Sequence, residues 1–176
     1  ALDGVDAERI ARLQPAVVVV QPSATGVDPG VLALQERLSF TLVTHRLDGA
    51  GDVIAAIDAL EAAGVGEASR AAAHRDALGM LAESAALPRP EGSPRTLVLH
   101  AVDPFAAAGA GTYLDEVVRA AGGVNALPRT GWCTLGAEEV VGLDPDVVLL
   151  VTGGIADIGA LEQLPWPRST TVRTLD

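Results

Sequence analysis

Residues 7–20 read AERIARLQPAVVVV, and residues 137–150 read AEEVVGLDPDVVLL. In both stretches an alanine and a glutamate open a short helix-forming segment, a proline follows, and a run of aliphatic residues ends the stretch. Proline ends a helix, and an unbroken aliphatic run is typical of a strand in a sheet that is covered on both faces. The repetition therefore predicts two similar α/β lobes in one chain. Two lobes form a cleft, and clefts are where small molecules bind.

The composition limits the fold and the partners. The chain has 176 residues, of which 49% are hydrophobic, so it can bury a substantial core. Its formal net charge is −11, whereas nucleic-acid binding needs a cationic surface. We therefore expect no nucleic-acid partner and no binding to anionic membrane surfaces. The longest apolar runs are far shorter than a bilayer span, and the sequence opens without a methionine or a signal-peptide pattern.

Helix and strand patterns alternate along the chain, which predicts parallel strands joined by helices. A long alanine-rich tract, residues 52–86, favours helix, and Gly64 and Gly66 mark a break within it. Glycine-containing loops are expected at 101–111 and 131–136. Outside the second repeat, the other expected helices are 6–13, 30–38, 112–121 and 157–164, and the other expected strands are 16–20, 40–44, 96–100 and 170–175.

Further phrases follow in a definite order: GTYLDEVV at 111–118, AGGVNA at 121–126, and Gly131-Trp132 before the second repeat. Together with the two repeats, they resemble the substrate-binding proteins of ABC importers for cobalamin, haem and ferric siderophores. The resemblance covers nearly the whole chain. It implies two α/β lobes joined by one long, stiff helix, a bound small molecule and no enzymatic activity. One departure is Ala16, which follows the proline of the first repeat where this family usually has aspartate.

The fold class predicted is α/β, with two lobes of mostly parallel sheets joined by a long connecting helix and an incomplete first lobe. Residues 1–51 are expected to form the partial N-terminal lobe, 52–94 the connecting helix region and linker, and 95–176 the C-terminal lobe. The resemblance implies an additional α/β segment before the first repeat and a closing helix at the end, and this sequence contains neither. Because a partial lobe exposes an unpaired sheet edge, we expect homodimerisation through that edge.

Four side chains are candidates for the ligand site. Trp132 stands where the family often places an aromatic residue against its ligand, and an indole offers a rigid face to a macrocycle. The alternative is a tryptophan that only seals the loop against its own lobe. His45 and His100 follow predicted strands, where α/β folds present binding loops, and together with Tyr113 they could ligate haem iron. Histidines at strand ends also often make only local hydrogen bonds.

Two acids are candidates for docking onto the importer's membrane subunits. The resemblance implies Glu138 as the carboxylate that pairs with arginines of those subunits, with Asp28 as its counterpart in the first lobe. A glutamate at a helix N-terminus also stabilises the helix dipole, so both interpretations of Glu138 remain open. Trp166, between two prolines, is interpreted as structural. The single cysteine, Cys133, excludes an intrachain disulfide, and no histidine and cysteine spacing indicates a metal site.

The leading hypothesis is a periplasmic or surface-tethered binding protein of an ABC importer, without catalysis and without a cofactor of its own. A cobalamin-like corrinoid is the first choice of ligand because of Trp132, and haem or a ferric siderophore follows. Any lipid anchor would lie in a segment outside this chain. One alternative is a small cytosolic α/β enzyme on a flavodoxin-like or Rossmann-like sheet, although the chain has no cofactor fingerprint or catalytic triad. The other is a degenerate dimerising module without a ligand.

Overall fold

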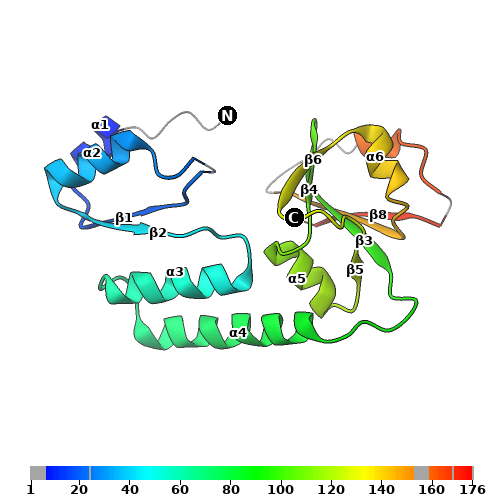
Figure 1. Ribbon diagram of the computed structural model, residues 1–176, viewed down its shortest axis with the longest axis horizontal. Helices are drawn as coiled ribbons and strands as arrows, with labels where there is room; N and C mark the ends of the chain where they lie inside the picture. The colour runs from blue at the N-terminus through cyan, green and yellow to red at the C-terminus, as the bar shows by residue number, and fades with distance from the viewer. Residues whose placement is uncertain (1–6, 24, 153–158, 168, 176) are drawn as a thin grey trace. The chain divides into compact units, whose positions relative to one another are not determined.

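The computed structural model describes residues 7–23, 25–152, 159–167 and 169–175 (Figure 1). The chain divides into two compact units between Gly79 and Met80. This boundary falls inside the helix α4 (Ala68–Ala86), so α4 contributes residues to both units.

The first unit contains the first repeat. Its strands pair in parallel, with Val17 opposite Thr41, as the alternation of helix and strand predicted. The expected break at Gly64 and Gly66 is confirmed, and both glycines have positive φ, a conformation that suits a residue without a Cβ atom. The elements of this unit before α4 are α1 (Ala7–Leu13), β1 (Val17–Val20), α2 (Pro29–Leu38), β2 (Thr41–Thr44) and α3 (Ala50–Ala62).

The two-stranded sheet of the first unit is only partly covered. A core of Val31, Leu34 and Phe40 packs with residues of α1 and of both strands. On the opposite face, Val43 is buried because α3 lies against β2, whereas the adjacent Val19 of β1 is 56% exposed. The prediction that both faces of the first repeat's strand are covered is therefore wrong, because no helix of the described residues shields Val19.

The second unit is built on one mixed sheet with the strand order β6-β4-β3-β7-β8, and β5 pairs with the start of β3. Strands β5 and β7 run parallel to β3, and β8 runs parallel to β7, whereas β4 and β6 are antiparallel to their neighbours. The elements are β3 (Arg95–Val102), β4 (Phe105–Ala108), α5 (Tyr113–Ala120), β5 (Val124–Asn125), β6 (Trp132–Leu135), α6 (Ala137–Gly142), β7 (Val147–Val151), α7 (Gly159–Glu162) and β8 (Thr171–Leu175).

Two predicted loops are wrong. The segment 101–111 contains the end of β3 and the whole of β4, and the segment 131–136 contains β6. Both strands exist because β4 pairs with β3 on one side and with β6 on the other. The expected helix at 157–164 is present as α7, which ends at Glu162, two residues earlier than predicted, and residues 157 and 158 lie outside the described residues.

Helices cover both faces of the second unit's sheet (Figure 1). Leu114 and Val118 of α5 pack on one face, and Val140 of α6 and Leu161 of α7 pack on the other. The strand of the second repeat, β7, is buried from both sides, as predicted. The two repeat strands belong to separate sheets in separate units, which agrees with two α/β lobes.

Candidate functional site

His100 owes its position to an irregularity in β3. Leu99 pairs with Ala107, and Ala101 pairs with Ala106, so His100 is an extra residue that has no partner on β4. Such a β-bulge bends the strand and redirects a side chain, and bulges are frequent beside functional sites. Here the bulge leaves His100 exposed at the carboxyl-terminal part of β3.

A close backbone contact positions Trp132 at the start of β6. The N–H of Gly109 donates to the carbonyl of Gly131 at 2.9 Å, and the N–H of Ala110 donates to the carbonyl of Arg129 at 2.8 Å. A Cβ atom at position 109 would lie 1.9 Å from the Arg129 carbonyl oxygen. Only glycine therefore permits the two segments to approach so closely. Trp132 then pairs with Ala108 across β4 and β6.

Tyr113 is oriented by the N-terminal cap of α5. Thr112 is fully buried, its hydroxyl donates to the Gly109 carbonyl at 2.8 Å, and its oxygen accepts the Asp115 N–H at 3.2 Å. The Asp115 carboxylate accepts the N–H of Gly111 at 3.0 Å, so the backbone on both sides of Thr112 is hydrogen-bonded to a side chain. Thr112 is thus the N-cap of α5, and Tyr113 is the first residue of the helix.

The bulge, the close backbone contact and the helix cap bring three of the four sequence-predicted ligand residues together. The rings of His100 and Trp132 meet edge to face, with centroids 5.0 Å apart. The centroids of Tyr113 and Trp132 are 6.4 Å apart at an interplanar angle of 56°. Trp132 and Tyr113 are each 41% exposed, so the cluster presents aromatic surface to solvent. We refer to His100, Tyr113 and Trp132 as the aromatic cluster.

Burial shifts the protonation equilibrium of His100. Partial burial lowers the pKa of His100 below its ordinary value of 6.5, because desolvation penalises the imidazolium form. The neutral imidazole therefore dominates at pH 7. A neutral imidazole is the form that donates a nitrogen lone pair to a metal.

The fourth candidate, His45, belongs to the first unit. It follows β2 and lines an open pocket together with the four residues of that strand, Ala59 and Ala62 of α3, and Ala63 at the C-cap of that helix. The candidate docking acids both lie on exposed helix starts. Asp28 is the N-cap of α2 and accepts the Gly30 N–H at 2.6 Å, and Glu138 stands in the first turn of α6.

Trp166 is structural, as predicted. Its indole N–H donates to the Leu161 carbonyl at 2.8 Å, and its ring packs against the larger core of the second unit. In the part of the chain that the structure describes, no group of three or more histidine, cysteine or acidic residues could hold a metal ion. No helix in this part is long and apolar enough to cross a bilayer.

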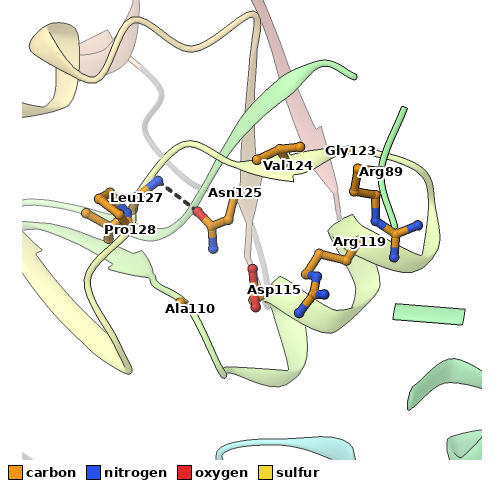
Figure 2. Close-up of a pocket in the computed structure, with 9 residues that line it drawn as sticks. All are labelled: Arg89, Ala110, Asp115, Arg119, Gly123, Val124, Asn125, Leu127 and Pro128. Carbon is orange, nitrogen blue, oxygen red and sulfur yellow. Dashed lines mark hydrogen bonds between the residues drawn. The ribbon is translucent and has the colours of Figure 1, made fainter. Parts of the chain in front are cut away.

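Sequence reasoning missed a second pocket, which runs along α5 in the second unit (Figure 2). It is lined by Arg89, Asp115 and Arg119 among others. The only signal in the sequence is the spacing of Asp115 and Arg119, four residues apart on one predicted helix. Nothing in the sequence indicates that Arg89 joins them, because it lies beyond the end of the preceding helix.

No protein-family model matches this sequence, and a search of curated proteins finds no match. Solved structures do match. The periplasmic haem-binding protein HutB of Vibrio cholerae aligns with 98% of this chain and 72% of its own length, at a TM-score of 0.70 and 19% identity. A periplasmic haem-binding protein from Pseudomonas aeruginosa aligns with 92% of this chain and 61% of its own length, at a TM-score of 0.68 and 22% identity.

The periplasmic vitamin B12 binding protein BtuF of Vibrio cholerae aligns with 84% of this chain, at a TM-score of 0.59 and 22% identity. The chain spans 58% of the length of BtuF and 61% of the length of the Pseudomonas protein. The resemblance expected from the sequence is thus confirmed in the fold, which is that of periplasmic haem- and B12-binding proteins.

Proposed function

We propose that this chain is the substrate-binding component of an ABC importer and that it captures an iron tetrapyrrole on the aromatic cluster. The observation that carries the proposal is the solvent-facing contact of Trp132 with His100 and Tyr113. An indole provides a flat apolar face for a macrocycle, while imidazole and phenolate are both axial ligands of haem iron. Two of the similar structures are named for haem, which supports an iron tetrapyrrole, and vitamin B12, named for a third, is a macrocycle of related shape that carries cobalt.

Haem is favoured over a corrinoid by the chemistry of the cluster. Trp132 alone would suit either macrocycle, but His100 and Tyr113 add two iron-ligating side chains beside it. The lowered pKa of His100 keeps its imidazole neutral and available at neutral pH. A carboxylate-rich ferric siderophore would require free arginines near the cluster, and Arg129, which precedes β6, forms a salt bridge with Glu139.

The test is titration of the purified chain with hemin, cyanocobalamin and a ferric siderophore, followed by tryptophan fluorescence and by the Soret absorbance of hemin. Hemin alone should bind. Trp132→Ala should weaken hemin binding by about 1–3 kcal/mol, which corresponds to the loss of one buried aromatic contact. His100→Ala and Tyr113→Phe should each change the Soret spectrum if that side chain ligates iron.

His74→Ala is the matched control, because His74 is an exposed histidine on α4 and should leave hemin binding unchanged. His45→Ala tests whether the fourth sequence-predicted ligand residue affects hemin binding. Equal hemin affinity of the wild type and all three cluster variants would remove the aromatic cluster from the function. Quenching by cyanocobalamin without hemin binding would reassign the ligand to a corrinoid.

The importer's membrane subunits are the proposed protein partner, with Glu138 and Asp28 as docking acids. Both carboxylates are exposed, and a carboxylate–arginine pair provides orientation as well as energy. Glu138→Lys should reduce the stimulation of importer ATPase activity by the loaded chain, and Glu83→Lys, on the exposed face of α4, should not. This role also places the protein outside the cytoplasm, in the periplasm or at the cell surface.

A second candidate function, association without a ligand, is favoured by one observation. The outer edges of the β1–β2 sheet are unpaired in the described residues, and Val19 is 56% exposed on its face. Unprotected edges of this kind pair with other chains. Sedimentation velocity should then detect dimers that Val19→Lys abolishes, while Val65→Lys, at another exposed valine, leaves them intact. A monomer at all concentrations would eliminate this candidate.

A further inference from the structure

Two oppositely charged residues of α5, Asp115 and Arg119, do not form a salt bridge with each other. Asp115 and Arg119 are four residues apart, a spacing at which opposite charges on a helix usually meet. Asp115 is only 4% exposed, and one of its carboxylate oxygens accepts the N–H of Gly111 as part of the helix cap. Among the described residues, no salt bridge or hydrogen bond engages the guanidinium of Arg119. Arg119 is therefore a half-buried cation without an anion.

A second guanidinium reaches the same pocket and is held in place. Arg89 donates from Nη2 to the carbonyls of Ser84 and Ala85 in the last turn of α4, at 2.8 Å each. Its Nε atom is buried and has no hydrogen-bond partner in the described part of the chain. Because two carbonyls already anchor this guanidinium, little conformational entropy would be lost when an anion binds beside it.

The rest of the pocket is small and mainly apolar. Its volume is about 200 Å³. Asn125 lines it, but both ends of its amide already make a hydrogen bond. Nδ2 donates to the carbonyl of Ala108 at 3.0 Å, and Oδ1 accepts the N–H of Leu127 at 2.9 Å (Figure 2). The apolar part of the wall consists of Ala110, Val124, Leu127 and Pro128. The guanidinium groups are therefore the polar groups of this wall that are available to a ligand.

We propose that this pocket binds a small organic carboxylate, at a site distinct from the aromatic cluster. Two guanidinium groups outweigh the one carboxylate of Asp115, which the cap already engages, so the pocket is locally cationic in a chain of net charge −11. Unpaired cations in a partly buried position are costly, and an anion offsets that cost. The planar fork of arginine matches a carboxylate, and a short aliphatic tail matches the apolar wall.

The test is a titration of the full chain with sodium butyrate at constant ionic strength, followed by amide chemical shifts in NMR spectra. Saturable shifts are expected at Gly123, Val124 and Leu127. Arg119→Gln should raise the dissociation constant for butyrate by about tenfold or more, since a charge-assisted hydrogen bond is lost. Arg119→Lys should raise it less than Arg119→Gln does, because it keeps the charge but lacks the fork.

Arg70→Gln is the matched control, because it removes the same charge from an exposed position on α4 in the first unit. It should change the dissociation constant less than about twofold, and Arg119→Gln should leave hemin affinity unchanged. The proposal is overturned if wild-type chain shows no saturable butyrate binding, or if Arg119→Gln binds butyrate as tightly as the wild type. Tighter binding of inorganic phosphate than of butyrate would overturn the assignment to a carboxylate.

Discussion

At the scale of single residues, the aromatic cluster depends on side chains whose types could be recognised but whose contacts could not. Trp132, His100 and Tyr113 stand out in the sequence because aromatic and histidine residues are few in it. Their meeting depends on the bulge at His100, on the cap at Thr112 and on the pairing of Trp132 with Ala108. The cap has a local signal in Thr112, whereas the bulge and the strand pairing have no local pattern that reveals them in advance.

The pKa of His100 leads to a prediction about stability and pH. Its pKa is lowered in the folded state, so between that pKa and 6.5 the unfolded chain binds more protons at this site. The His100 contribution to the free energy of unfolding should therefore decrease as the pH falls through this window. Above pH 6.5 the His100 contribution to the free energy of unfolding should be constant. The measurement is urea unfolding from pH 5 to pH 8 for the wild type and for His100→Asn.

The difference between those two proteins isolates the contribution of His100, because His45 and His74 are present in both. Wild-type stability should fall more steeply than that of His100→Asn as the solution becomes acidic. Parallel pH profiles would show that the imidazole is not desolvated beside Trp132. His74→Asn, at an exposed position, should follow the wild type throughout.

At the scale of elements, the strands β4 and β6 show how pairing overrides local preference. The β4 sequence FAAA contains a single residue with strong strand preference, and the glycines that follow it indicate a loop. It is nevertheless a strand, because β3 and β6 supply hydrogen-bonding partners on both of its sides. The hydrogen bonds of Gly109 with Gly131 and of Ala110 with Arg129 then join the end of β4 to the segment that leads into β6, where the Arg129 carbonyl lies close to Gly109.

Gly109→Ala tests this contact. The added methyl group would overlap the Arg129 carbonyl oxygen, so the backbone must shift and two interstrand hydrogen bonds must weaken. We expect destabilisation of about 1–3 kcal/mol, typical of overpacking at a close contact. Gly142→Ala is the control, since nothing lies within 4 Å of its added Cβ atom and alanine favours the helix α6.

The readout is the free energy of unfolding from urea titration, together with near-UV circular dichroism of the aromatic cluster. Gly109→Ala should lower the free energy of unfolding. It should also reduce the near-UV circular dichroism signal, because Trp132 would shift relative to Tyr113. Gly142→Ala should leave the circular dichroism unchanged and should not lower stability. Equal stability of Gly109→Ala and the wild type would mean that the backbone at Gly109 can move away from the Arg129 carbonyl without loss of stability.

At the scale of the whole molecule, the two units differ in the size of their cores. The main cluster of the first unit has three buried residues among those described, whereas the larger cluster of the second unit has ten. Burial of apolar surface is the dominant stabilising contribution in folding. The first unit should therefore open more readily than the second.

Hydrogen exchange tests this difference. Amides of β1 and β2 should exchange faster than those of β3 and β7, because a smaller core permits cheaper local opening. Leu34→Ala and Leu150→Ala form a matched pair, one buried leucine in each unit, and each should cost about 2–5 kcal/mol. Leu34→Ala should accelerate exchange only in the first unit. Uniform protection across both units would show that they unfold as one.

The repeated helix–proline–strand phrase, the break at Gly64 and Gly66 and the cap at Thr112 could be predicted from the sequence, because each depends on residues adjacent in the chain. The same holds for the α/β class and for the resemblance to importer binding proteins. The strands β4 and β6, the exposed Val19, the aromatic contact of His100 with Trp132 and the pocket of Arg89 and Arg119 could not be predicted. They arise from pairing and packing between segments distant in sequence, and no local preference records which segments meet.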